Sequence, residues 1–270
     1  MNHGNYPLAS SPDEIKRLRI QAESLADEAA FMLDRIGVAP GMACLDLGCG
    51  AGGIVDLLSA RTGPDGRVVG LDVDEFSIAA AREWAKALGL TNVSFETGGI
   101  FDNTLAAESF DMVHVRYVIT TIGSHEEVVQ AALRLVKPGG VLALQEADAD
   151  GIHVYPPCAA FDRLKAVLIS LFAEIGADPY AGRRVYGLLR NAGLTNVDFR
   201  ACTARARSQD DLADYLPQTV QSVRDTIMKL GLMTETDVEK AIAACRAHLD
   251  DAATISTTST VFQAWGRKGA

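Results

Sequence analysis

The chain has 270 residues, of which 48 % are hydrophobic and 22 % are charged, with 24 glycines and 9 prolines. This composition is typical of a globular protein and excludes disordered, collagen-like and disulfide-framework chains. Acidic residues number 35 and basic residues 25, which gives a formal net charge of −10. We therefore expect no nucleic-acid partner, because the chain lacks the excess of Lys and Arg that phosphate backbones require.

The five cysteines are scattered and include no Cys-x-x-Cys pair. That pattern predicts free thiols in a reducing compartment. The first residues show no basic-then-apolar signal pattern, and no apolar run reaches the roughly 18 residues that a membrane span needs. We expect a cytoplasmic protein without a membrane partner, whose oligomeric state the sequence leaves open.

The first predicted element is one long amphipathic helix. Ser11 is a candidate N-cap, with Glu14 three residues later, and Gly37 ends the pattern. Apolar residues between them recur at alternating steps of three and four. Because this helix precedes the first predicted strand, residues 1–40 are interpreted as an N-terminal helical lid.

From residue 42 onward, strand patterns alternate with helix patterns. Strands are predicted over 42–47, 67–73, 93–96, 110–118 and 141–145. This alternation indicates an α/β fold with a doubly wound, mostly parallel sheet covered on both faces. Beyond residue 146 we expect a loop over 149–158, helices over 161–175, 183–192 and 208–250, and strands over 196–202 and 257–266.

A glycine-rich turn after the first strand carries the strongest chemical signal. Gly48, Gly50 and Gly53 let the backbone turn tightly and approach a ligand at a helix N-terminus. Asp72 ends the second strand, where a carboxylate can accept both hydroxyls of a ribose. Asp46 lies two residues before the first glycine, and its charge would repel a pyrophosphate but suits an amino group or a sulfonium. The sequence therefore favours an adenosine-type nucleoside over a dinucleotide.

Four ordered segments resemble motifs of the class I S-adenosylmethionine-dependent methyltransferases. They are Leu45–Gly52 (LDLGCGAG), Val69–Asp72 (VGLD), Ser109–Val113 (SFDMV) and Leu135–Leu142 (LVKPGGVL). The resemblance covers residues 42 to about 147. It implies a seven-stranded sheet whose last strand is antiparallel. It also implies a methyltransferase domain over 41–270, with helical insertions at about 155–180 and 208–250 like those of the small-molecule branch.

The resemblance also implies roles for individual residues. Asp46 would hold the cofactor's amino group, Gly48 and Gly50 would pack against the cofactor, Asp72 would bind the ribose, and Val73 would flank the adenine. The family often has Gly-Asp after the third strand, but this chain has Gly98-Gly99, so Asp102 or a backbone carbonyl is expected to read the adenine amino group. The other residues expected at the cofactor are Ile100, Phe101, Arg116, Tyr6 and Gln21.

Residues near the ends of the fourth and fifth strands are candidates for the acceptor site. His153 is the candidate general base, because ligands bind outside the carboxyl ends of parallel strands. Tyr117, Asp148 and Tyr155 are the candidate substrate-binding residues. The metal-dependent catechol-type enzymes of the family carry a further Asp and Asn after the fourth strand. This chain has Arg116-Tyr117-Val118 there, so we predict no metal.

The predicted function is methyl transfer from S-adenosylmethionine to a small organic acceptor, in specialised metabolism. Oxygen, nitrogen, carbon and sulfur nucleophiles all stay open at this point. One alternative is an NAD(P)-dependent oxidoreductase, which would place a pyrophosphate on the glycine turn. The other is a cyclase or binding module that holds the same cofactor without transferring its methyl group, because fold alone does not decide function.

Overall fold

The computed structural model describes residues 11–269. One sheet contains all eight strands, in the order β3-β2-β1-β4-β5-β8-β6, with β7 also paired to β8. The strands are β1 Ala43–Leu47, β2 Arg67–Asp72, β3 Val93–Thr97, β4 Phe110–Arg116, β5 Val136–Asp148, β6 His153–Tyr155, β7 Thr195–Arg207 and β8 Ile255–Arg267. Strands β1 to β5 are mutually parallel, and β8 runs antiparallel to β5. The predicted doubly wound sheet with an antiparallel last strand is confirmed.

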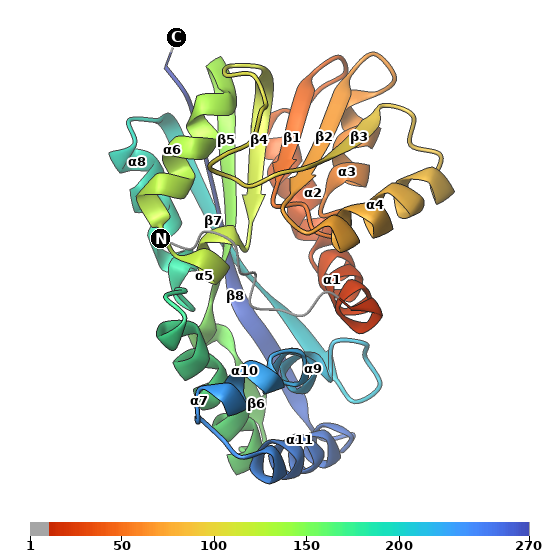
Figure 1. The fold of residues 1–270 in the computed structure, drawn as a ribbon, viewed down its shortest axis with the longest axis vertical. Coiled ribbons are helices and arrows are strands. Elements are labelled where there is room, and N and C mark those ends of the chain that lie inside the picture. Colours follow the sequence, from red (N-terminus) through yellow and green to blue (C-terminus); the bar gives the residue numbers. More distant parts are fainter. Residues whose placement is uncertain (1–10, 270) are drawn as a thin grey trace.

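Helices cover both faces of the sheet (Figure 1). On one face Cys44 and Met112 pack beneath α2 Ala26–Ile36, α3 Val55–Thr62 and α4 Glu75–Ala87. On the other face Leu45 and Val113 pack beneath α6 His125–Leu135 and α8 Val185–Asn191. Because successive strand residues point to opposite faces, these apolar strands are buried on both sides, as parallel sheets require.

The predicted N-terminal helix is two helices in the structure. Ser11 caps α1 Pro12–Ser24 by accepting the Glu14 N–H at 3.2 Å. The helix ends at Leu25, whose φ of −110° and ψ of 6° are non-helical, and α2 follows. The expectation of one continuous helix was therefore wrong. Helix α2 packs on the sheet core, whereas α1 lies across the end of the sheet (Figure 1).

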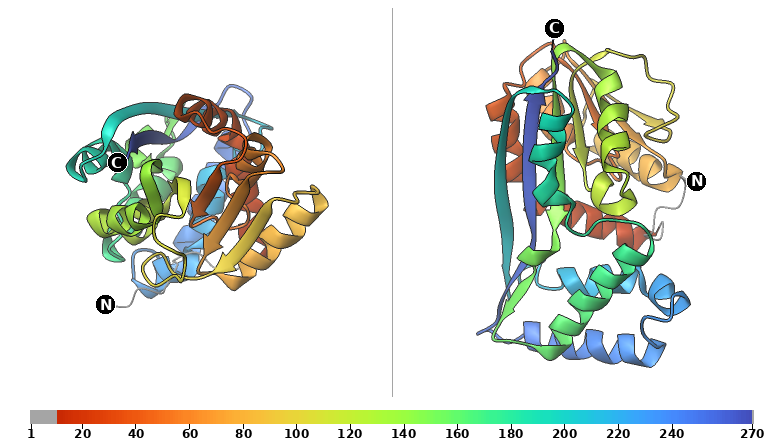
Figure 2. Two further views of the ribbon diagram at one scale, coloured as in Figure 1. Left: turned by 90° about the horizontal axis from the view of Figure 1, so that it is seen from above. Right: turned by 90° about the vertical axis from the view of Figure 1, so that its left-hand side faces the viewer.

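The lower half of the molecule in Figure 1 is mostly helical. It contains α7 Ala159–Glu174, α9 Tyr215–Ser222, α10 Arg224–Lys229 and α11 Glu235–Leu249, which share a separate apolar core. The long strands β7 and β8 run along both halves (Figure 2, right). Residues 208–214, predicted as helix, are turns. Within residues 11–269, no helix is long and apolar enough to cross a membrane.

The predicted loop over 149–158 contains the short helix η1 Ala149–Gly151 and the strand β6, which pairs antiparallel with β8. The sheet therefore has one strand more than the seven expected. Strand β5 continues for 13 residues as far as Asp148, well past the end of β4.

Candidate functional site

The turn between β1 and α3 depends on its glycines. Gly48 and Gly53 have φ of +82° and +53°, values that side chains with a Cβ rarely adopt. A Cβ on Gly48 would lie 2.5 Å from Val118 Cγ2, and one on Gly53 would collide with the Asp46 carboxylate. The turn therefore requires glycine at both positions. Its backbone lies along the wall of a cavity.

Asp46 organises the base of this turn. Its side chain is only 1 % exposed; Oδ2 accepts the Ile54 N–H at 3.0 Å, and Oδ1 lies 2.7 Å from His114 Nδ1. Burial alone would raise the pKa of Asp46, but the His114 ring, Arg116 and the Ile54 N–H together lower it below its usual value. Asp46 thus stays ionised. His114 is fully buried.

Asp72 is held by the backbone on both sides. Its Oδ2 accepts the Gly50 N–H at 2.8 Å, and its Oδ1 accepts the Asp74 N–H at 2.9 Å. Burial raises the pKa of Asp72, and these two hydrogen bonds only partly oppose that shift. Each carboxylate oxygen can accept a further hydrogen bond. Asp72 therefore presents a fixed pair of acceptors to the cavity.

One cavity of about 750 Å³ runs along the carboxyl ends of β1, β2 and β4. The structure brings most of the predicted cofactor residues into its wall, together with the candidate acceptor residue Tyr117. Those residues are Gln21, Asp46, Gly48, Gly50, Asp72, Val73, Ile100, Phe101, Asp102, Arg116 and Tyr117. Tyr6, the remaining predicted cofactor residue, lies outside the described residues.

The other end of the cavity is formed by residues that sequence reasoning missed. They come from α7, α9 and α10: Leu168, Ile169, Phe172, Tyr215, Thr219, Thr226 and Lys229. No motif marks these positions. Their helical apolar spacing is the same as that of any core helix, so only the packing of the helices against the sheet identifies them.

The two ends meet at Tyr117. This residue has a φ of +57°, unusual for a side chain with a Cβ, and it directly follows β4. Burial, and next the nearby Tyr215, raise the pKa of Tyr117 well above its usual value, so its phenol stays protonated. Gln21 Nε2 donates to Tyr215 Oη at 3.1 Å and so joins α1 to α9 across the cavity. Arg116, just before Tyr117, has a buried Nη1 without a hydrogen-bond partner among residues 11–269.

His153, the predicted base, does not line this cavity. Its exposed side chain lies on β6, beside a second hollow that is lined by Asp148, Asp150, Arg183 and Phe262 among others. Tyr155 is 67 % exposed and lines neither space. The physical reason is the alternation of side chains along an extended segment: Ile152 lines the cavity, so His153 and Tyr155 point away from it. The expectation that they meet the acceptor has no support in this geometry.

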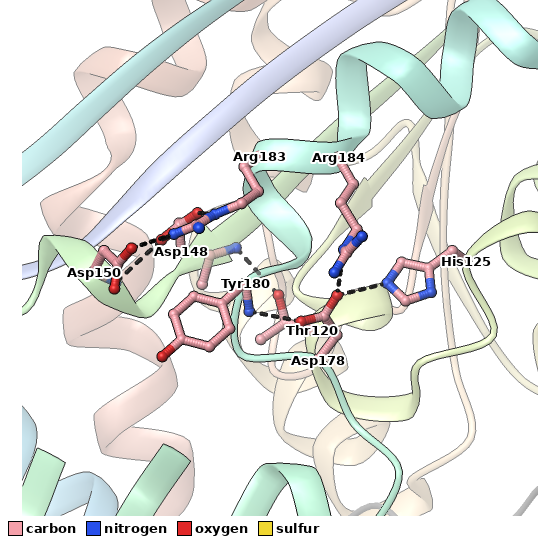
Figure 3. Close-up of polar contacts among 9 residues, drawn as sticks. Thr120, His125, Asp148, Asp150, Asp178, Tyr180, Arg183 and Arg184 are labelled. Carbon is pink, nitrogen blue, oxygen red and sulfur yellow. Dashed lines mark hydrogen bonds and ion pairs between the residues drawn. The ribbon is translucent and has the colours of Figure 1, made fainter. Parts of the chain in front are cut away.

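Asp148, the third residue placed near the acceptor, is paired elsewhere. Arg183 donates to Asp148 at 2.5 and 2.7 Å and also pairs with Asp150 (Figure 3). In the same view, His125 and Arg184 both contact the Asp178 carboxylate, at 2.8 and 2.9 Å. These ion pairs fasten the segment that carries η2 Ala181–Arg184 to the sheet. Asp148 is a structural anchor outside the main cavity.

Glu146 is a buried carboxylate at the junction of the two halves. It accepts the N–H groups of Ile119 and Thr120 and the Thr120 hydroxyl, at 3.0, 2.9 and 2.6 Å. Burial raises its pKa to about 7 in spite of these bonds. It thereby holds the first turn of α5 Val118–Ile122 next to Tyr117. No group of three or more His, Cys, Asp or Glu within residues 11–269 is arranged to hold a metal ion.

Comparisons with known proteins agree with this geometry. A family model described as "Methyltransferase domain" matches residues 39–176. The demethylmenaquinone methyltransferase of Bacillus cytotoxicus is 34 % identical over 58 % of this chain and 65 % of its own length. The chain spans less than two thirds of the first curated relatives it matches.

Two solved structures show how widely this fold is used. The Haemonchus contortus phosphoethanolamine N-methyltransferase 2, solved with S-adenosylhomocysteine, aligns with a TM-score of 0.57 and 16 % identity, over 92 % of this chain and 52 % of that one. The [4+2]-cyclase SpnF aligns at 0.54 and 18 %, over 91 % and 81 %. At these identities the likeness concerns the fold alone. With the family model covering just over half of its residues, the chain belongs to the family of methyltransferase domains.

Proposed function

We propose that this protein transfers the methyl group of S-adenosylmethionine to a small organic acceptor by in-line displacement. The observation that carries the proposal is one continuous cavity of about 750 Å³. It joins a nucleoside-type site at the sheet to an apolar chamber between helices. A methyl transferase needs this continuity, because the sulfonium and the nucleophile must lie in line.

The sheet end fits the adenosine part of the cofactor. Asp72 offers two fixed acceptors to the ribose hydroxyls. Val73 and Phe101, both in the cavity wall, are 50 % and 37 % exposed and offer apolar surface to the adenine. Ile100 also lies in the wall, and Asp102, from the same loop, is the candidate acceptor for the adenine amino group.

Arg116 and Gln21 are candidates for the methionine part. The buried Arg116 Nη1 has no hydrogen-bond partner in the described part of the chain, although an unpaired buried donor costs free energy. A cofactor carboxylate would satisfy it. Asp46, ionised at the base of the same wall, favours the positive charge of the amino group or sulfonium.

Bound S-adenosylmethionine supplies an electrophilic methyl group. The chain's own contribution is to orient the two reactants and to exclude water, which together are worth several kcal/mol. The hydrogen bond from Gln21 to Tyr215 joins α1 to α9 across the cavity. The free cysteines of the structure also support work in a reducing compartment, the cytoplasm.

The cofactor assignment is tested by comparing two ligands that share the adenosine part. S-adenosylhomocysteine carries the amino-acid carboxylate, and 5′-methylthioadenosine lacks it. We expect Arg116→Met to weaken the first at least about tenfold, the loss of a charge-assisted hydrogen bond, and to leave the second within about twofold. Arg190→Met, at an exposed position on α8, is the control. If Arg116→Met weakened both ligands equally, or weakened neither, Arg116 would not bind the cofactor carboxylate.

The reaction type is tested with cofactor labelled in its methyl group. Methyl transfer predicts that the label appears in a product extracted with the acceptor. A cyclase or binding module predicts the same cofactor binding with all label retained in the cofactor. This second outcome would keep the site and overturn the proposed reaction.

A further inference from the structure

The helical end of the cavity is an apolar chamber. Its wall includes Ile152 and Ile175 and, from α7, Leu168, Ile169 and Phe172. These side chains reach the chamber because α7 packs against α9 and α11 in a core of their own. A chamber lined in this way selects a hydrophobic molecule.

The acids that line the cavity all come from the N-terminal part of the chain. Their carboxylates belong to α1, β1, α3, β2 and the loops that follow β2 and β3: Glu23, Asp46, Asp56, Asp72, Asp74 and Asp102. Among the described residues from Tyr117 to Ser259 that line the chamber, none is Asp, Glu, His or Cys. The lining residues between 117 and 259 therefore offer an acceptor no group able to remove a proton at neutral pH.

The acids and histidines nearest to the chamber have other partners. Glu146 is enclosed by the N–H groups and hydroxyl that start α5. His125 Nε2 contacts Asp178, and neither residue lines the cavity. The titratable groups that do line the chamber are the phenols of Tyr117 and Tyr215 and the ammonium of Lys229. The phenols are donors, and the ammonium is a cation.

Lys229 gives the chamber its charge. It lies at the end of α10, one turn after Thr226, which also lines the cavity. No ion pair from the described residues neutralises it: Asp225, on the same helix, pairs with Arg224 instead. The Lys229 side chain is exposed, so this unpaired cation attracts an organic anion at the side of the chamber that faces solvent.

Building on the proposed function, we propose that the acceptor is an apolar organic anion whose oxygen nucleophile is already ionised at neutral pH. A carboxylic acid, or a strongly acidic enol or phenol, has this chemistry. Lys229 balances its charge, and the Tyr117 hydroxyl donates to the oxyanion. The carbon–sulfur bond of the methyl group breaks with its electron pair left on sulfur, and an oxygen lone pair forms the new bond to carbon. The sulfonium and oxyanion charges cancel, and no proton has to move.

Two fluorescent probes test this charge preference on a shared aromatic scaffold. 8-Anilinonaphthalene-1-sulfonate carries a negative charge, and N-phenyl-1-naphthylamine carries none. We expect protein saturated with S-adenosylhomocysteine to bind the anion at least about tenfold more tightly. Lys229→Gln should remove most of this preference and leave the affinity for the neutral probe within about twofold. Lys240→Gln, an exposed position on α11 away from the cavity, should change neither affinity.

A second variant tests whether the probes bind inside the chamber. Ile169→Trp adds bulk inside the chamber and should abolish the binding of both. The proposal is overturned if the neutral probe binds as tightly as the anion, if Lys229→Gln weakens both alike, or if neither probe binds. Calorimetry with S-adenosylhomocysteine on the same samples tests the cofactor assignment separately. If the cofactor product binds but the probes fail these tests, only the proposal about the acceptor is overturned.

Discussion

The two ends of the cavity are built in different ways. At the sheet end, polar groups are fixed by the backbone: Asp72 is held by two N–H groups, and Asp46 by Ile54 and His114. At the helical end, apolar side chains from α7 and the hydroxyls and one cation of α9 and α10 form the wall. On the proposed function, the constant cofactor would bind to rigid turns, and the acceptor would bind to side chains that can change without disturbing the sheet.

The largest effect is expected from a substitution that disrupts only the sheet end of the cavity. In Gly53→Ala the new Cβ would collide with Asp46, so the turn must move, and we expect affinity for S-adenosylhomocysteine to fall by about 100-fold or more. Gly37→Ala is the matched control, because its backbone is left-handed, with a φ of +82° and a ψ of +41°, but its Cβ would meet nothing within 4 Å. It should cost about 1 kcal/mol of stability and leave the affinity nearly unchanged. Calorimetric titration measures both, and equal affinities in the two variants would contradict the steric account.

A smaller effect concerns Glu146, where the two halves join. Burial raises its pKa from 4.5 to about 7, so the folded chain holds this proton more tightly than the unfolded chain does. Its contribution to stability is full below about pH 4.5 and is lost as the pH rises through about 7. It amounts to about 3 kcal/mol.

Glu146→Gln should therefore flatten the fall in unfolding free energy between pH 5 and pH 8, as measured by urea denaturation. Glu126→Gln, at an exposed position on α6, should keep the slope of the unmodified protein. If the Glu146 variant kept that slope as well, the protonation assigned to this carboxyl would be incorrect.

The smallest effect is expected at His153. Its exposed side chain lies outside the main cavity, so His153→Ala should leave the affinities for S-adenosylhomocysteine and for the anionic probe within about twofold. Fluorescence and calorimetry on this variant check the geometry. A loss of tenfold or more in either affinity would show that His153 belongs to the ligand site.

The sheet end could be predicted from sequence because its determinants are local. Asp46 and Gly53 belong to one turn, and the distance in sequence to Asp72 is that of one strand–helix–strand unit. The helical end could not be predicted, since Phe172 and Tyr215 come together only through packing between distant helices. Strand β6 was missed for a similar reason: its three residues carry no periodic pattern, and their partners lie about 100 residues away, at Ile255–Thr257 in β8. At Leu25 the apolar spacing continues without Gly or Pro, so no local signal marked the end of α1.

The most direct test of the central assignment is a calorimetric titration of the protein with S-adenosylmethionine, S-adenosylhomocysteine and NADH. The account predicts micromolar binding of the two sulfur nucleosides, no binding of NADH, and a loss of at least about tenfold in Asp72→Ala. Asp65→Ala, at an exposed turn before β2, should bind as the unmodified protein does. Binding of NADH in place of the sulfur nucleosides, or unchanged affinity in Asp72→Ala, would contradict it.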